Sequence, residues 1–581
     1  MRETGSLTGK ASVDRPWLKY YPPGFVEHIV IPECTLTEYL RTNCADETSI
    51  AMHYYGNDIP WKTVFEETEK VARALRAVGF GEGDQIPMFL RAVPEFIYLL
   101  LATEKIGASL LCRDNTLEEN IEATAKAGAS VILSHDYLSE SDLEHYLADS
   151  HVKTAILLDP LRSADRETIP DYIIRSFNEN YTDTPAHGSS TMSWDEFLAL
   201  GETFNGQVSA PVDIHRPLFR AYTSGSTGPS KQVIHSANTM IGVIHQMNFY
   251  GSADGCRPTW LITCLPPTLV AVVVAMILLP LASNKLLILD PFVDPHDVDL
   301  ELMRYRPNCW PLIPMFIEIV MRNGRIPEDH DLSYLQSAGA GCEAYNNGQM
   351  KRAQKFLHDH NCMITFTTGY GSSEAGSNVT LPMAPFPIRD GNVGIPMPLT
   401  DISIFKYGTT EECGYNEIGE ICKCGPGNML GYDTEEATAK SLMVHDDGKV
   451  WLHMGDTGYI TEDGVIYTVT RGESPRFGGG DLGIQPMENL VADAEIEGID
   501  DEFFVIIPDD EHEGYFLPYL YVVLEEGYTI EDIRESVNAC LEPYMVPIDI
   551  LAVPERPFFH FKTNRIGLTR ELLEMRKNEK K

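Results

Sequence analysis

Basic residues are scarce in this chain. Lys and Arg number 45 against 85 Asp and Glu, which gives a formal net charge of −40 at pH 7. Proteins that bind nucleic acids in general use clustered Lys and Arg to neutralise phosphates, and anionic membranes also attract basic surfaces. The acidic excess therefore argues against both kinds of partner. It does not exclude a small anionic ligand, which needs only a local basic site.

We expect neither a targeting segment nor a membrane-spanning segment from the sequence. The N-terminal residues MRETGSLTGKASVDRPW are polar and have no apolar centre of the signal-peptide type. A stretch without charged residues covers 258–284, but Pro266, Pro267 and Pro280 interrupt it. A spanning helix needs about 20 predominantly apolar residues. We therefore expect a helix buried inside a globular protein.

The 12 cysteines include no CxxC pair. The closest two are Cys422 and Cys424, with Cys413 nearby, and no fourth ligand stands at a spacing typical of zinc sites. Together with the polar N-terminus, this pattern indicates reduced thiols in a cytoplasmic protein.

The order of segments predicts an α/β fold with two domains. Helical patterns at 66–80 and 94–108 alternate with strand patterns at 85–90 and 129–134, as expected for a parallel sheet. From about residue 400 the chain consists of strand and hairpin patterns. A Gly-rich stretch follows Arg471, and then a shorter α/β pattern. We predict a large N-terminal domain over 1–472 and a small C-terminal domain over 473–581.

The segment YTSGSTGPSK (222–231) has the composition of a phosphate-binding loop. Glycines let the backbone approach an oxyanion closely, and hydroxyls and free N–H groups supply hydrogen-bond donors. Lys231 adds a positive charge. Its spacing differs from the GxxxxGK[ST] loop of nucleoside triphosphatases. By composition alone, a Ser/Gly surface loop without a ligand is equally consistent with this segment.

Further segments decide between these interpretations. The loop resembles the TSGTTGxPKG signature of the adenylate-forming (ANL) superfamily, which includes acyl-CoA synthetases, luciferases and peptide-synthetase adenylation domains. Segments that resemble other family motifs follow in family order, and the resemblance covers about residues 35–575. They are SAGAGCEA (337–344), TTGYGSSEAG (367–376), NVGIPMP (392–398), GYDTEEATAKSL (431–442) and WLHMGDTGYITEDGVIYTVTR (451–471).

The resemblance implies a large domain of stacked α/β sheets plus a small β-barrel, followed by a small mobile α+β domain. It also implies a nucleotide site, with Tyr370 and the backbone of 339–341 beside adenine. The implied nucleotide-binding residues are Thr223, Ser224, Gly225, Ser226, Thr227, Gly228, Gly339, Ala340, Gly341, Tyr370, Gly371, Ser373, Asp456 and Arg471.

Specific roles also follow from the resemblance. Glu374, with Thr223, is expected to hold Mg²⁺, a cation that favours carboxylate oxygens and retained water. Asp456 is expected to accept from the ribose hydroxyls, and Arg471 to lie near ribose and phosphate. Lys231 is expected to act at the phosphates as a catalytic residue.

The family chemistry has two steps and uses ATP, Mg²⁺ and coenzyme A. A carboxylate attacks the α-phosphate of ATP to give an acyl-adenylate and pyrophosphate, and a thiolate then displaces AMP. In the resembled family the small domain rotates between the steps. The hinge position is Glu473, where Asp or Lys is more usual, and Gly478, Gly479 and Gly480 would then face the thiol substrate.

One segment departs from the family pattern. The family's C-terminal lysine bridges the acyl carboxylate and ATP phosphate in a PxTxxGK motif, whereas this chain has PFFHFKTNRIGLTREL at 557–572. A register that matches Asn-Arg-Ile places Arg565 at the lysine position, and we prefer it. A register that aligns Thr563 places Gly567 there. Lys562 is the other candidate, and arginine does not present the same compact ammonium.

The acyl pocket in the resembled family is formed by segments matching 264–272, 313–320, 337–342 and 365–371. No Lys, Arg or Asp occurs in CLPPTLVAV (264–272) to pair with an amino-acid substrate. An apolar acid of fatty, aryl or steroid-like type is therefore expected. Two alternatives stay open: an adenylating enzyme that loads a separate carrier protein, and a nucleotide-binding homologue with weakened catalysis. The oligomeric state is not indicated.

Overall fold

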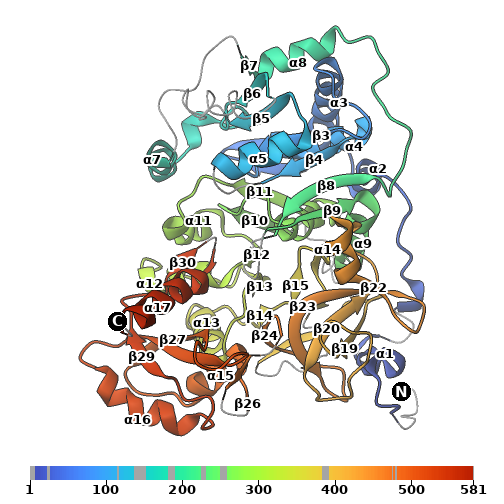
Figure 1. The fold of residues 1–581 in the computed structure, drawn as a ribbon. Helices are drawn as coiled ribbons and strands as arrows, with labels where there is room; N and C mark the ends of the chain where they lie inside the picture. Colours follow the sequence, from blue (N-terminus) through green and yellow to red (C-terminus); the bar gives the residue numbers. More distant parts are fainter. Residues whose placement is uncertain are drawn as a thin grey trace.

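The computed structural model describes residues 7–22, 26–113, 117–135, 152–180, 190–223, 230–248, 258–381, 391–473, 475–477, 480–559 and 561–579. Two α/β sheets and one antiparallel sheet form the large part of the molecule, and the small C-terminal part lies beside them (Figure 1). The predicted segments at 66–80, 85–90, 94–108 and 129–134 are helix, strand, helix and strand, which confirms the α/β assignment.

The first sheet has eight strands. Its inner strands are parallel, and β8, β9 and β21 pair antiparallel at one end. In spatial order the strands are β21 (Gly431–Tyr432), β9 (Gln232–Ser236), β8 (Pro217–Tyr222), β4 (Ser109–Cys112), β3 (Gln85–Phe89), β5 (Val131–His135), β6 (Thr154–Leu158) and β7 (Thr191–Ser193).

The second sheet has seven strands, which are parallel apart from the β1–β2 pair. In spatial order they are β14 (Thr367–Thr368), β13 (Ser337–Ala340), β12 (Cys309–Leu312), β10 (Thr259–Thr263), β11 (Leu286–Asp290), β1 (Ile50–Tyr54) and β2 (Asn57–Pro60).

One continuous apolar cluster joins the two sheets. Helix α4 (Pro94–Ile106) belongs to it and is buried over almost its whole length. Its ends follow from local chemistry: Pro94 at the first turn lacks an N–H that the helix would leave unpaired, and Gly107 ends the helix at a φ of 77°. The middle of α4 is almost entirely apolar, and it can therefore be buried on all sides.

The remaining helices of the large part cover the sheets. They are α1 (Ala11–Asp14), α2 (Leu36–Asn43), α3 (Trp61–Ala77), α5 (Leu117–Ala127), α7 (Asp171–Asn180), α8 (Trp194–Glu202), α9 (Ala237–Asn248), α10 (Leu279–Ala282), α11 (Val298–Tyr305), α12 (Pro314–Asn323), α13 (Asn347–Asp359) and α14 (Glu435–Ser441).

The uncharged stretch at 258–284 lies in the core, as predicted, but it is not one helix. Strand β10 takes its start, and a π-helical segment, Val272–Leu278, leads into α10. The segment from Val272 to Ala282 is buried throughout, within the same apolar cluster. Among the described residues, none of the helices combines the length and apolar composition needed to cross a membrane.

The third sheet is antiparallel and has its own apolar cluster, which includes Trp17 from the N-terminal segment. In spatial order its strands are β17 (Thr380–Leu381), β18 (Asn392–Pro396), β24 (Ile466–Arg471), β23 (Val450–Ile460), β20 (Gly419–Cys424) and β19 (Asp401–Phe405), with β22 (Leu442–Val444) paired to β23. This sheet corresponds to the expected small barrel.

The C-terminal part is a three-stranded sheet with its own apolar cluster. Its strands and helices are β25 (Arg476–Phe477), β26 (Gly480–Asp481), α15 (Ile484–Asp493), β27 (Ile499–Pro508), β28 (Phe516–Leu524), α16 (Ile530–Cys540), β29 (Asp549–Ala552), β30 (Phe558–Phe559), β31 (Lys562–Thr563) and α17 (Arg565–Glu579). The proposed boundary at 472/473 lies in the connection between β24 and β25.

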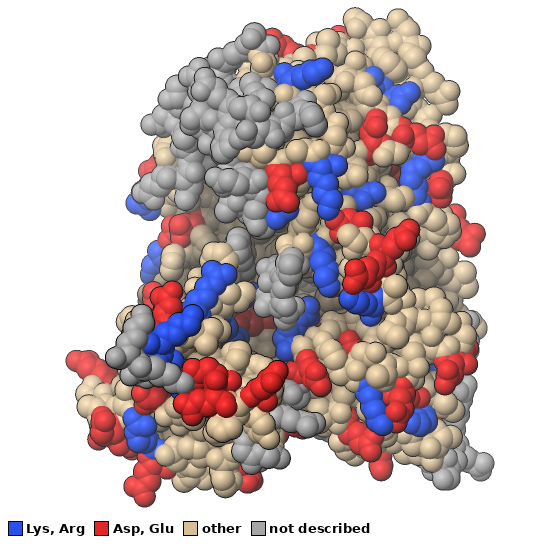
Figure 2. All heavy atoms as spheres, viewed as in Figure 1, with Lys and Arg blue, Asp and Glu red and all other residues tan. Residues whose placement is uncertain are grey.

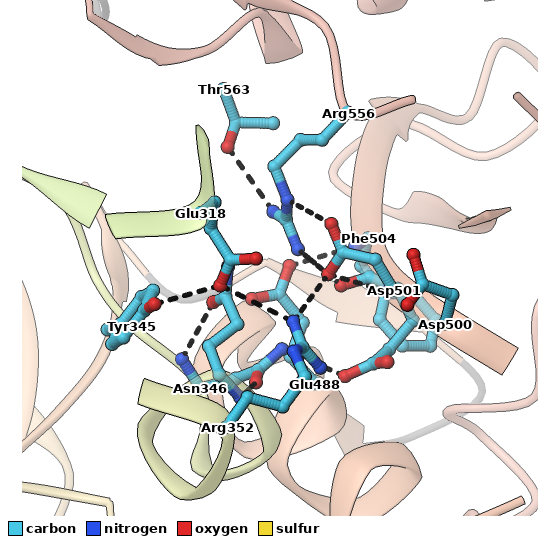
Figure 3. A network of polar contacts seen from close by, with 12 residues as sticks. Glu318, Tyr345, Asn346, Arg352, Glu488, Asp500, Asp501, Phe504, Arg556 and Thr563 are labelled. Carbon is cyan, nitrogen blue, oxygen red and sulfur yellow. Dashed lines mark hydrogen bonds and ion pairs between the residues drawn. The ribbon is translucent and has the colours of Figure 1, made fainter. Parts of the chain in front are cut away.

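A buried ion cluster joins the two parts (Figure 3). Asp501 of β27 is fully buried and accepts from Arg556 through both carboxylate oxygens, at 2.9 and 2.7 Å. Arg352 of α13 and Arg322 of α12, both from the large part, approach the same carboxylate to 3.5 Å. Removing one partner of such a buried pair costs about 3–5 kcal/mol, because a buried charge stays uncompensated.

Hydrogen bonds from two asparagine residues extend this interface. Asn346 Nδ2 donates to Glu502 Oε1 at 2.9 Å, and Asn347 Nδ2 donates to Asp493 at 2.8 Å. The Asn347 N–H donates to Asn489 Oδ1 at 2.9 Å. The start of α13 is thus bonded to both α15 and β27.

The buried Glu502 at this interface predicts that the stability of the folded protein depends on pH. Burial, with the neighbouring Asp501 charge, raises the pKa of Glu502 to about 8, whereas an unfolded glutamate titrates near about 4.3. The folded state therefore holds a proton that the unfolded state has lost, and stability falls as pH rises through this interval. Between pH 6 and 9 we expect a loss on the order of 2–3 kcal/mol from this group.

Glu502→Gln should remove this loss while keeping the oxygen that accepts from Asn346. Urea unfolding at pH 6, 7.5 and 9 measures it as the difference between wild type and variant. Glu535→Gln, at an exposed position of α16, is the matched control. Parallel pH profiles for wild type and Glu502→Gln would contradict the assignment.

Candidate active site

The predicted phosphate loop closes a β-hairpin. Strands β8 and β9 pair antiparallel, and beyond them the Thr223 N–H donates to Lys231 O at 2.9 Å. The Lys231 N–H donates to Thr223 Oγ1 at 3.0 Å, and Ser230 Oγ donates to Thr223 O at 2.6 Å. The two ends of the loop are therefore held together. Ser224, Gly225, Ser226, Thr227 and Gly228 lie outside the described residues.

Lys231 and Glu374 are connected through a tyrosine that had no predicted role. The Lys231 ammonium lies over the Tyr432 ring, 4.8 Å from its centroid. The Tyr432 hydroxyl donates to Glu374 Oε1 at 2.8 Å. Tyr432 reaches this position because β21 pairs with β9, opposite Val233. It lies in the family-like segment 431–442, which was the one available signal in the sequence.

A second supporting residue, His235, lies on β9. Burial lowers its pKa to about 4, so the imidazole is neutral near pH 7. Its Nε2–H donates to Ser373 O at 2.8 Å, and its Nδ1 accepts from Thr239 Oγ1 at 3.1 Å. Strand β9 thus connects Lys231 at one end of the loop with the backbone beside Glu374. A lone histidine in a strand gave no sequence signal for this role.

Asp456 lies between two predicted residues. It accepts from the Tyr370 hydroxyl at 2.7 Å and from Arg471 Nη1 at 2.8 Å. The pairing of β23 with β24 places Asp456 directly opposite Arg471. Burial raises the pKa of Asp456, and the Arg471 charge opposes that rise. A carboxylate has about four acceptor positions, so Asp456 retains capacity for a further donor.

A buried group supports the turn before Asp456. Glu420 accepts from the N–H groups of Gly455 at 3.2 Å and Gly408 at 2.9 Å, and from His453 Nδ1 at 2.8 Å. Glu420, Cys422 and His453 offer ligand atoms within 4.8 Å of one another. Because three N–H donors already satisfy Glu420, we assign this cluster to structural support and not to a metal site.

The predicted adenine-side segments meet at one edge of the second sheet. Strand β13, which carries Gly339 and Ala340, pairs in parallel with β14, and Tyr370 follows β14 by two residues. A Cβ at Gly339 would lie 3.0 Å from Thr367 O, and one at Gly371 would lie 2.0 Å from Ser377 O. Both positions require close backbone contact. Gly341 has open space around its Cβ position, next to the carboxyl ends of parallel strands, where ligands bind in open α/β sheets.

The two C-terminal candidates have different surroundings. Arg565 donates to Phe504 O at 3.1 Å, to Glu343 at 3.0 Å and to Glu488 at 2.7 Å. Within the described part of the chain, the Lys562 ammonium makes no hydrogen bond or ion pair. The Lys562 ammonium is close enough to the Cys342 thiol to interact with it electrostatically, and Cys342 directly follows Gly341. Lys562 therefore lies near the turn that contains Gly341, and the geometry favours it over Arg565 as the free cation.

Glu473 and its neighbours connect the two parts. The Gly472 N–H donates to Gly455 O at 2.9 Å, whereas Glu473 is exposed. Gly478 and Gly479 lie outside the described residues. Figure 2 shows acidic side chains over the small part, and Lys and Arg side chains bordering the hollow at the centre of this face.

A family model described as AMP-binding enzyme matches residues 41–433. The chain belongs to this family. This confirms the predicted ANL superfamily and the assignment as an enzyme. The matched range contains the phosphate hairpin, the adenine-side segments, Glu374 and Tyr432. Asp456, Arg471, Glu473, Gly478, Gly479, Lys562 and Arg565 lie beyond it.

Curated relatives of similar length share low identity with this enzyme. A long-chain-fatty-acid–CoA ligase of Bacillus subtilis is 24% identical over 562 residues, covering 92% of this chain and 93% of the relative. The 4-coumarate–CoA ligase CCL1 of Humulus lupulus is 26% identical over 506 residues, covering 83% of each.

Solved structures share the fold. ATP-bound MatB from Rhodopseudomonas palustris has a TM-score of 0.75 at 18% identity, covering 93% of this chain and 98% of the other. The anthranilate CoA ligase AuaEII, in complex with anthranoyl-AMP, has a TM-score of 0.77 at 15% identity, covering 95% and 99%. The large N-terminal and small C-terminal arrangement is thus shared.

The Tyr370 hydroxyl is predicted to orient the Asp456 carboxylate for AMP binding. Tyr370→Phe keeps the ring and removes one hydrogen bond to a buried carboxylate, so we expect the Kd for AMP to rise about 5–10-fold. Isothermal titration calorimetry measures this change. Tyr467→Phe, whose ring stacks on Tyr459 at 4.9 Å, is the control and should bind AMP as wild type does. Equal affinity of Tyr370→Phe and wild type would remove the hydroxyl from the site.

Proposed function

We propose that this enzyme activates an apolar carboxylic acid with ATP to an acyl-adenylate and then transfers the acyl group to coenzyme A. The products are acyl-CoA, AMP and pyrophosphate. The supporting observation is the contact of Lys231 and Glu374 with Tyr432, with the Asp456–Arg471 pair close enough to interact electrostatically with Glu374. Lys562 of the small part lies near the turn that contains Gly341. The relatives named as CoA ligases support the same reaction.

Adenylation requires charge neutralisation more than acid–base chemistry. A carboxylate oxygen attacks the α-phosphorus of ATP, the bond to the bridging oxygen breaks, and pyrophosphate leaves with that electron pair. Lys231 and Arg471 stabilise the negative charge on the phosphates, and fixed charges in a closed site do so without reorganisation. Asp456 orients the nucleotide through its ribose hydroxyls.

The donor set fits a hydrated magnesium ion. Mg²⁺ in proteins takes one or two carboxylates and completes its shell with water and substrate phosphates. Glu374 is buried, its Oε1 accepts from Tyr432, and its carboxylate has further acceptor positions. Glu374 and the Thr223 hydroxyl, which lies at one end of the phosphate hairpin, would hold the ion. When bound, Mg²⁺ neutralises charge on the phosphates.

Lys562 supplies the cation from the small domain in this proposal, and Arg565 stabilises the docked hairpin. The proposed domains are 1–472 and 473–581. The small domain would rotate about Glu473 after adenylation, because hinge positions need only absorb a backbone change. The Gly478–Gly480 segment would then face the thiol.

The acid is proposed to be fatty, aryl or steroid-like. Within 264–272, which the family resemblance assigns to the acyl pocket, Leu265, Val270 and Val272 are buried and no residue is charged. Glu318, the acidic residue in the second pocket segment, 313–320, bonds instead to Tyr345 at 2.8 Å and to Arg352 at 3.4 Å. An apolar acyl group is compatible with such a lining.

Pyrophosphate release over a panel of fatty, aryl and steroid acids tests the proposal, with and without coenzyme A. We expect pyrophosphate and AMP to form with at least one apolar acid, and a thioester only when coenzyme A is added. Turnover only with a carrier protein would favour carrier loading. Tight ATP binding without pyrophosphate from any acid would favour a homologue with weakened catalysis.

Substitution of the two C-terminal cations separates their roles. Lys562→Ala should lower the rate of adenylation about 100-fold, because a cation at the transferring phosphate is lost. Single-turnover pyrophosphate release measures this rate, and thioester formation from supplied acyl-adenylate should change less than about 2-fold. If Arg565→Ala slows adenylation and Lys562→Ala does not, the role belongs to Arg565 instead.

Glu374→Gln should raise the Mg²⁺ concentration needed for half-maximal ATP binding about 10-fold, because a carboxylate ligand is lost. The Mn²⁺ affinity of the enzyme–ATP complex, measured by electron paramagnetic resonance, gives the same quantity without turnover. Glu328→Gln, at an exposed position, is the control. Unchanged metal affinity would exclude Glu374 as a ligand.

A further inference from the structure

Glu343 of the large domain binds the hairpin that carries Lys562. It follows Gly341 by two residues, and its side chain is 10% exposed. Both of its carboxylate oxygens accept from the Thr563 N–H, each at 3.1 Å. Oε1 also accepts from Arg565 Nη1 at 3.0 Å. We call the turn that contains Gly341 the nucleotide turn. One side chain beside this turn therefore contacts both Thr563 and Arg565, the two neighbours of Asn564.

The bound N–H lies immediately after Lys562. Strand β31 consists of Lys562 and Thr563, which pair with Phe559 and Phe558 of β30. A change in the position of the Thr563 backbone must therefore move the Lys562 side chain with it. Phe561, at a φ of 64°, forms the turn and packs edge-on against Phe316 of α12, at 6.2 Å between centroids.

The buried interface reaches the same hairpin from the other side (Figure 3). Arg556 Nη1 donates to Thr563 Oγ1 at 3.3 Å, while Nε and Nη2 bind Asp501. Asp501 in turn lies 3.5 Å from Arg352 of the large domain. Thr563 is thus held through its N–H by Glu343 and through its hydroxyl by Arg556.

The buried charge of Glu343 requires the partners that the small domain supplies. A carboxylate two residues from a nucleotide turn repels phosphate unless a cation compensates it, and it loses hydration when buried. Arg565 and the Thr563 N–H, both from the small domain, compensate it. Since these partners arrive together with Lys562, docking of the hairpin satisfies Glu343 and delivers the lysine in one event.

We infer that Glu343 is a positioning residue for adenylation, which couples the nucleotide turn to the hairpin and places Lys562 at the site. This rests on the proposed function. The role is confined to the half-reaction that uses Lys562 in this domain arrangement. A residue needed only for folding would affect both half-reactions alike.

Three substitutions of Glu343 test the inference. Glu343→Ala removes every contact with the hairpin, and Glu343→Gln keeps an oxygen for the Thr563 N–H but removes the charge that pairs with Arg565. We expect single-turnover pyrophosphate release to fall about 100-fold for Ala and about 10-fold for Gln. Thioester formation from supplied acyl-adenylate and coenzyme A should stay within about 2-fold of wild type. Glu343→Asp should recover part of the adenylation rate lost in Glu343→Ala.

Hydrogen exchange provides a readout that does not depend on turnover. Peptides covering 556–570 should exchange faster in Glu343→Ala, while peptides from β27 should not change. Glu328→Gln is the matched control in both measurements.

Equal loss in both half-reactions, with a lower melting temperature, would show a purely structural role and overturn the inference. Wild-type adenylation and exchange in Glu343→Ala would also overturn it. Failure of the proposed function is distinguishable, because wild type itself would then release no pyrophosphate with any acid.

Discussion

A buried carboxylate, Asp501, is the constraint on which the assembled site depends. An ionised side chain without water must be paired with cations and hydrogen-bond donors. Asp501 forms ion pairs with Arg556 from its own domain and with Arg352 and Arg322 from the large domain. This requirement fixes how the small domain sits. That orientation fixes the hairpin through Thr563, and the hairpin fixes Lys562.

The net charge of −40 has a similar consequence for the nucleotide site. An acidic chain that uses anionic substrates must concentrate its few cations and hold each one in place. Lys231 lies over an aromatic ring, Arg471 pairs with Asp456, and Arg565 bridges Glu343 and Glu488. The carboxylates that hold these cations also limit their net charge. Lys562 makes no ion pair with the residues that the structure describes, and we propose it as the cation that acts on an incoming phosphate.

Three residues behind the candidate site hold its side chains and backbone in place. Tyr432 binds Glu374, His235 binds the carbonyl of Ser373, and Glu420 binds the N–H before Asp456. Each joins two segments that are distant in the chain. Because these contacts are satisfied by neutral or fully paired groups, they hold the reactive carboxylates without adding free charge near the phosphates.

The sequence by itself determined the features that depend on neighbouring residues. The composition and order of the motifs predicted the family and the α/β class, and they supplied the residues proposed for the nucleotide site. Pro94 and Gly107 mark the ends of a helix because their preferences are local. The choice between Lys562 and Arg565 could not be made locally, since the two cations lie only three positions apart in one segment. Only the tertiary structure shows that Arg565 is paired while Lys562 has no ion pair among the described residues. The partners of Arg565 are Glu343 and Glu488, which lie 222 and 77 residues away along the chain. The roles of Tyr432, His235 and Glu343 have the same origin: each depends on a contact that folding creates and that sequence spacing does not encode.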